Sequence, residues 1–151
     1  MPQHSETRFL PYPARAMYDL VADVAAYPQF LPWTAAARIR SVTDQGDHQV
    51  MLADLVVSFK VFRESFGSRV VLWPAELRID TEYLEGPFSR MQSRWQFRDR
   101  VKDGIAGCDV DFAVDFEFRN RLLAGAAGLF FNEAMTRIVR AFEGRAKQLY
   151  G

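Results

Sequence analysis

The sequence predicts a single α+β domain over residues 1–151, in which a curved antiparallel sheet of about six or seven strands wraps around a long C-terminal helix. Three observations lead to this fold class. Of the 151 residues 49% are hydrophobic and 14% aromatic, which is enough apolar volume for one sizeable core. Apolar residues recur at every second position through the middle of the chain. In 120–150 they recur at helical spacing instead.

Residues 14–24 are expected to form a short helix, because Pro13 suits a helix start and apolar side chains follow at helical spacing. The helix must end before 27–33, Tyr-Pro-Gln-Phe-Leu-Pro-Trp, because each proline fixes its own φ and disfavours the helical region for the residue before it. An apolar loop of this kind needs something to cover it. Two interpretations stay open: the loop plugs the domain's own core, or it forms the lip of an apolar cavity or membrane-facing surface.

Alternating apolar residues predict a meander of strands after this loop. The odd-numbered residues of 51–61 share one apolar face, so Val50, Leu52 and Val56 would face outward, where they could recruit a partner protein. Shorter alternating runs occupy 62–73 and 76–84. Turn residues separate them from each other and from the strands that follow.

Segments 91–101 and 108–118 are expected to pair as a hairpin with its turn in 102–107. If Val101 pairs with Cys108, apolar residues meet on one face and arginines meet aspartates on the other. We interpret the acidic row as a solvated face with ion pairs worth roughly 0.2–1 kcal/mol each, and not as catalytic carboxylates or a cation site. The predicted pairs are Trp95 with Val114, Phe97 with Phe112, Arg100 with Asp109, Arg98 with Asp111, and Arg94 with Asp115.

Residues 120–150 predict the long amphipathic helix, with an apolar row that includes Phe130, Ile138 and Phe142. Gly125 and Gly128 are expected to weaken or break its first turns, so that the firm helix begins near residue 129. Residues 119–151 carry a surplus of basic side chains. We expect the helix to pack on the sheet and keep these cations in water, in preference to lying on a membrane.

Composition excludes several function classes. The 19 basic and 19 acidic side chains cancel, which argues against DNA binding. A lone cysteine, Cys108, and two histidines, His4 and His48, predict no disulfide and no metal site. The sequence has neither a run of about 18 apolar residues nor a signal peptide at its start, so a cytoplasmic location is expected.

The order of elements resembles the helix-grip, START-like superfamily, which includes polyketide cyclase-like proteins. Within it, Asp23-Val24 followed by 27–33 resembles the signature of the coenzyme Q-binding START-domain family. Two further blocks, 84–88 with Trp95 and Phe97 and then 141–150, resemble the same family, so the likeness covers nearly the whole chain. Thr34 departs from it, because many members have a cysteine there.

This resemblance implies non-catalytic binding of ubiquinone or a related polyprenyl lipid in an apolar cavity, in support of quinone synthesis or respiratory electron transfer. No cofactor would be required, and contact with the inner face of a membrane would be peripheral. Bacterial relatives are named ribosome association toxins, which implies the large ribosomal subunit as an alternative partner. The candidate lining residues, each of which could equally be ordinary core, are Phe30, Leu31, Trp33, Phe88, Trp95, Phe97, Phe116, Phe131 and Met135.

An enzyme related to cyclases and dehydratases is the third hypothesis, and it needs an ionisable group inside the cavity. The candidates that alternation turns inward are Asp99, Tyr83, Thr81 and Ser93. Asp99 lies near the turn end of its strand and is expected to be structural, and Cys108 is expected to act as a small core hydrophobe. The sequence shows no nucleophile motif or metal-ligand spacing, so we expect a protein that is not an enzyme.

Overall fold

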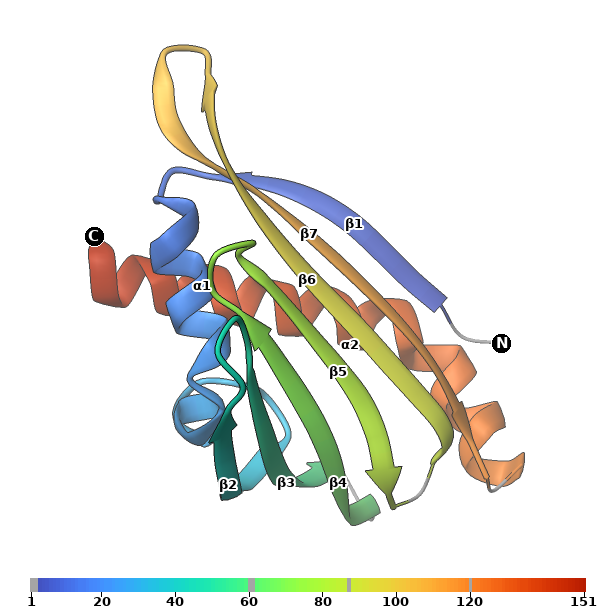
Figure 1. Cartoon of the computed structure of the whole chain (residues 1–151). Helices are drawn as coiled ribbons and strands as arrows, with labels where there is room; N and C mark the ends of the chain where they lie inside the picture. The colour runs from blue at the N-terminus through green and yellow to red at the C-terminus, as the bar shows by residue number, and fades with distance from the viewer. Residues whose placement is uncertain (1–2, 60–61, 87, 120) are drawn as a thin grey trace.

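The computed structural model describes residues 3–59, 62–86, 88–119 and 121–151, with the side chains of these residues except 59, 62, 88, 118 and 121–132. A seven-stranded antiparallel sheet of order β1-β7-β6-β5-β4-β3-β2 curves in front of the long helix α2 in the view of Figure 1. This arrangement confirms the predicted architecture. The elements are β1 (Gln3–Leu10), α1 (Ala14–Ala22), the 3-10 helix η1 (Val24–Gln29), β2 (Thr34–Asp44), β3 (Gln49–Phe59), β4 (Phe62–Trp73), β5 (Arg78–Glu85), β6 (Phe88–Lys102), β7 (Ile105–Phe118) and α2 (Arg121–Tyr150).

Helix α1 begins where the sequence predicts and ends two residues earlier. Pro13 stands before its first residue but offers no side-chain cap. The Asp99 carboxylate of β6 accepts a hydrogen bond from the backbone N–H of Ala14 at 2.8 Å, which satisfies one of the donors left open at a helix start. Asp99 is therefore structural, as expected. The chain then continues as η1, with Pro28 inside that short helix.

The β6–β7 hairpin has the predicted faces but a different register. Val101 pairs with Ala106, not with Cys108, so the pairing predicted from the sequence is wrong by two residues. The turn is tighter than expected: Asp103 and Gly104 both have positive φ, the conformation that two-residue hairpin turns require and that an Asp-Gly pair favours. A shift of two residues leaves every side chain on its predicted face, because the side-chain period of a strand is two.

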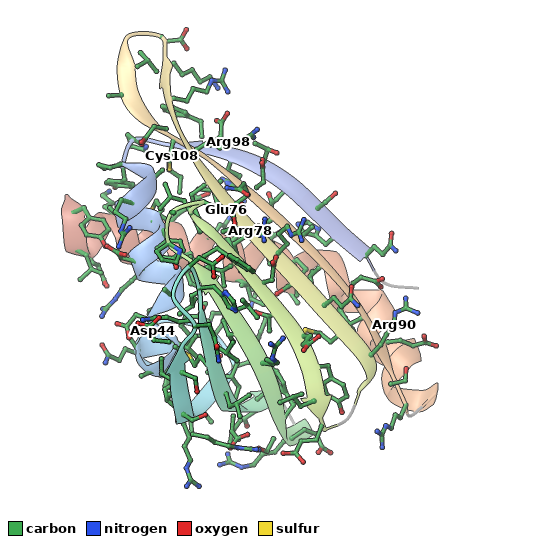
Figure 2. All side chains as sticks on the ribbon, viewed as in Figure 1. Asp44, Glu76, Arg78, Arg90, Arg98 and Cys108 are labelled. Carbon is green, nitrogen blue, oxygen red and sulfur yellow. The ribbon has the colours of Figure 1, made fainter. Side chains whose placement is uncertain are left out.

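The shifted register changes the partners of the hairpin residues. On the apolar face Trp95 meets Phe112 and Phe97 meets Val110. Two predicted ion pairs survive as diagonal contacts, Arg98 with Asp111 at 2.7 Å and Arg100 with Asp109 at 3.0 Å. The third is wrong, since Arg94 pairs with Asp80 of β5 and Asp115 pairs with Arg90. Figure 2 shows Arg98 and Arg90 near opposite ends of β6.

Helix α2 differs from the prediction at its start. It runs without interruption from Arg121, so the expected break at Gly125 and Gly128 is wrong. Each glycine costs about 1 kcal/mol in a helix interior, but Ala124, Ala126 and Ala127 between and beside them are the strongest helix formers. The local preference for helix therefore outweighs the two glycines.

The core lies between α1, the second half of α2 and one end of the sheet. We call the face of the sheet turned towards α2 the inner face. Helix α1 packs on β6, β7 and α2, and its Met17 and Val21 are fully buried with Phe97 and Cys108 of the sheet. Burial raises the pKa of the Cys108 thiol to about 11, as befits a small apolar core residue.

We expect Gly107→Ala to destabilise the fold, because a Cβ at this position would lie 2.1 Å from the Leu10 carbonyl oxygen of the neighbouring β1. The strain is of the order of 1–3 kcal/mol in the free energy of unfolding. Gly144→Ala in α2 is the matched control: no heavy atom lies within 4 Å of the added methyl, and a stabilisation of about 1 kcal/mol is expected. Urea denaturation measures both, and equal effects would contradict the crowding at Gly107.

Candidate functional site

Strand registers arrange the side chains of the inner face in rows that cross the sheet. The packed row consists of Leu72, Ile79, Trp95 and Phe112, none more than 8% exposed, and ends on β1 at the half-buried Glu6. The next row lies two residues further from the β6–β7 turn, nearer the start of α2, which follows β7 (Figure 1). We call it the polar row, and its members are Val70, Thr81, Ser93, Val114 and His4.

Exposure is greater in the polar row than in the packed row. Val70 is buried, but Thr81, Ser93, Val114 and His4 are half-buried although they face the helix. Side chains on a covered face can be half-exposed only if they border open space. In the row beyond it Met91 and Tyr83 are half-buried, whereas Ser68 and Phe116 are buried. The inner face thus has a packed end and, from the polar row onward, a less tightly packed end, which we call the open end.

Aromatic rings fill the packed end. Phe142 of α2 lies edge-on to Trp95 at 5.1 Å between ring centroids, and Trp95 stacks on Phe112 at 4.3 Å. Tyr27 and Phe30, from the proline-rich loop, reach the same Phe142 at 5.4 and 5.3 Å. Edge-to-face and offset contacts at these distances are the favoured aromatic geometries. The first half of the loop therefore plugs the domain's own core.

Tyr27 also ties this loop to α1. Its hydroxyl donates a hydrogen bond to the Val21 carbonyl oxygen at 2.5 Å. Burial, with a smaller contribution from the Asp23 carboxylate, raises the pKa of the Tyr27 phenol above its usual value. The phenol therefore stays protonated and keeps its donor role across the physiological pH range.

Trp33 occupies a different position from the rest of the loop. It is half-buried outside the core cluster, and its φ of 64° lies in the left-handed region that bulky residues avoid. Its carbonyl oxygen accepts a hydrogen bond from Ser58 at 2.7 Å, and the Arg137 guanidinium of α2 lies 6.0 Å from its ring centroid. The surrounding structure holds Trp33 at the junction of loop, sheet and helix, in a conformation that costs roughly 1–3 kcal/mol.

The nine candidate lining residues fall into five groups. Trp95 and Phe97 belong to the packed core, and Phe30, Leu31 and Met135 are half-buried against it. Phe116 is buried on the inner face beyond the polar row, outside that core cluster. Trp33 lies at the loop junction. The side chains of Phe88 and Phe131 lie outside the described residues.

The alternation of apolar residues in the sequence did not reveal a series of ionisable side chains on the inner face of β1. His4 Nε2 lies 2.9 Å from Glu6 Oε1, the second Glu6 oxygen lies 3.7 Å from Arg8, and Arg8 pairs with Glu143 of α2. These residues face inward because they stand opposite Val114, Phe112 and Val110 of β7. Neither face of β1 is apolar throughout, so only its pairing with β7 could have revealed them.

The outer face of the sheet carries an open hollow of about 780 Å³ across β1, β7, β6, β5 and β4. Its outward side chains are of mixed charge and include Arg69, Asp80, Arg94 and Asp115. Val50, on the neighbouring β3, stands opposite Val71 on this face, as the sequence predicts for 49–61. The outer face is therefore a salt-bridged surface with an apolar margin on β3.

Neither a metal cluster nor a membrane span emerges from the described part of the chain. No group of three His, Cys, Asp or Glu side chains there could hold a metal ion. None of the described helical stretches is long and apolar enough to cross a membrane.

This geometry, a curved sheet around a long helix with an open end on the inner face, defines a START-like domain. Residues 10–143 match the family described as polyketide cyclase / dehydrase and lipid transport, and the chain belongs to this family. The START superfamily protein of Mycobacterium smegmatis shares the fold at 24% identity, with a TM-score of 0.76 over 97% of this chain and 98% of that one. These findings confirm the predicted fold family.

Other relatives share a higher sequence identity with this chain. The ribosome association toxin RatA of Pseudomonas aeruginosa is 37% identical over 94% of this chain and 93% of its own length. A mitochondrial coenzyme Q-binding protein COQ10 homolog B of Xenopus laevis is 31% identical, and the match spans 99% of this chain and 59% of that protein. The 18 kDa protein CC1736 of Caulobacter crescentus has 34% identity and a TM-score of 0.80, with 100% and 99% coverage.

Fold relatives also include enzymes. The Zhui aromatase/cyclase of Streptomyces superposes with a TM-score of 0.78 at 19% identity, over 97% of this chain and 94% of that one. Such a likeness concerns the fold and not the chemistry. In the present chain, the inward carboxylate named from the sequence, Asp99, is exposed and caps α1.

We expect Phe142→Ala to lower the free energy of unfolding by about 3–5 kcal/mol, because it removes the ring that joins Trp95, Tyr27 and Phe30. Trp33→Ala removes a ring outside the core cluster and is expected to cost less than half as much. Thermal and chemical denaturation of both variants measure the difference. A Trp33→Ala cost equal to that of Phe142→Ala would place Trp33 in the core after all.

Proposed function

We propose that this protein associates with the ribosome, with the large subunit as its partner. The observation that carries the proposal is the likeness to RatA proteins, which spans nearly the full length of both chains. Several of these relatives, at 36–37% identity, exceed the 31% of the coenzyme Q-binding relative. In this proposal the protein works in the cytoplasm.

The exposed side of α2 is the surface that suits ribosomal RNA. Arg140 and Lys147 are exposed and have no ion-pair partner among the described residues. Arginines on the outer face of the sheet are instead neutralised by aspartates, as in the pairs of Arg98 and Arg100. Because the chain has no net charge, contact with RNA phosphates would depend on this local excess of cations.

Sedimentation through sucrose gradients with separated ribosomal subunits tests the proposal. The protein is expected in the large-subunit fraction at low salt and not at high salt, because added counterions weaken phosphate contacts. Arg140→Gln with Lys147→Gln should lower the bound fraction several-fold. The matched control, Arg98→Gln with Arg100→Gln, removes the same charge from the hairpin and should leave binding unchanged. Failure to sediment with either subunit contradicts the proposal.

The open end of the inner face supports a second function, the non-catalytic binding of ubiquinone or a related polyprenyl lipid. Its support is the half-buried residues of the polar row, together with a relative named for coenzyme Q binding. Moving a prenyl tail from a bilayer into water costs about 0.8 kcal/mol of free energy for each exposed CH₂ group. A water-free space in the protein therefore needs only a suitable shape to hold the tail. Loading would involve peripheral contact with a membrane.

Lipid extraction and mass spectrometry of the natively purified protein test this function, and a quinone or prenyl lipid is expected. Val114→Phe should narrow the space over the polar row and reduce the bound lipid several-fold, because Val114 is half-buried there. Since Val114 also packs against the core, a loss of stability of about 1–3 kcal/mol is expected, which leaves the variant folded. Ala113→Phe, the next residue on the outer face of the same strand, is the matched control. Absence of any such lipid, with no binding of added ubiquinone, contradicts the second function.

A further inference from the structure

The polar row places two hydroxyl groups between apolar residues near the centre of the inner face. Thr81 of β5 and Ser93 of β6 stand directly opposite each other, with Val70 and Val114 on either side. Directly opposed residues of an antiparallel pair have Cβ atoms about 4.5–5.5 Å apart. Two hydroxyl groups are thus held as neighbours on rigid, adjacent strands.

These two side chains are also small where their neighbours along each strand are large. On the inner face of β6 Ser93 lies between Met91 and Trp95, and on β5 Thr81 lies between Ile79 and Tyr83. Serine has little preference for a strand interior and adds little apolar contact there. The pair therefore makes the surface of the sheet lower at its middle, next to the packed Trp95.

The hydroxyl groups are available for a hydrogen bond. Neither has a hydrogen-bond partner among the described residues, and neither hydroxyl oxygen is fully buried there. A polar group that faces an apolar space loses free energy unless something in that space pairs with it. His4 closes the row on β1, where it is already engaged with Glu6.

We propose that Thr81 and Ser93 are the head-group site of the inner face, where their hydroxyls donate hydrogen bonds to neighbouring oxygens of a quinone-type ring. The inference rests on the lipid-binding function proposed above and adds what that function leaves open, namely which residues select an oxygen-bearing head. The ring lies over the polar row, beside Trp95, and the prenyl tail runs over the apolar inner face towards Phe116. Apolar burial supplies affinity, and the hydroxyl pair supplies selectivity.

Two ligands of related chemistry and two sets of variants test this assignment. The probes are a short-tailed ubiquinone and squalene, an isoprenoid hydrocarbon without oxygen, each titrated against the full chain. Thr81→Val and Ser93→Ala remove the hydroxyls with little change in volume. Ser41→Ala and Thr43→Val, on exposed positions of β2, are the matched controls.

The double variant at the polar row should bind ubiquinone roughly tenfold more weakly, as expected for two lost hydrogen bonds, and bind squalene as the wild type does. The control variants should bind both probes unchanged. If the double variant binds ubiquinone as tightly as the wild type, or loses affinity equally for both probes, the head-group site is wrong. The proposed lipid-binding function would not be contradicted by that result. If the wild-type protein binds neither probe, both the lipid-binding function and this assignment fail.

Discussion

The contact between Phe142 and Trp95 is the interaction on which the arrangement of the domain depends. It joins the last helix to the centre of the sheet, and the proline-rich loop inserts Tyr27 and Phe30 against the same ring. The rings close one end of the space between helix and sheet so completely that the packed row is nearly inaccessible. Because the packing is concentrated there, the other end of the inner face stays open, and the two proposed functions occupy separate surfaces: the inside of the sheet and the outside of α2.

Much of the fold could be predicted from periodicity alone. The inward and outward sides of β3, β6 and β7 followed from alternation, and they survived a register error of two residues because such a shift does not exchange faces. The register differs because Asp103 and Gly104 form a two-residue turn within a longer segment, 102–107, that contains a second glycine. The break expected at the glycines of α2 does not occur, because helix preference is summed over neighbouring residues and three alanines adjoin these glycines.

The candidate site was less predictable, for physical reasons. Alternation could turn Thr81 and Ser93 inward, but only the pairing of four strands shows that they share a row with Val114 and His4. Apolar residues lining a space and apolar residues filling it look alike in a sequence. Phe30 and Phe97 were candidates for the first role, yet they lie in or against the packed core, whereas Phe116 lies nearer the open end.

The charges on β1 have a consequence for how the molecules behave towards one another. β1 and β2 form the two edges of the open sheet, where unpaired backbone groups could recruit a strand from another chain. At one edge His4, Glu6 and Arg8 point inward, and inward-pointing charges are a known protection against such pairing. At the other edge, irregularities at 34–36 and 39–41 interrupt the ladder. Both edges of the sheet are therefore protected against pairing with another chain, by inward-pointing charged side chains on β1 and by the irregular pairing of β2.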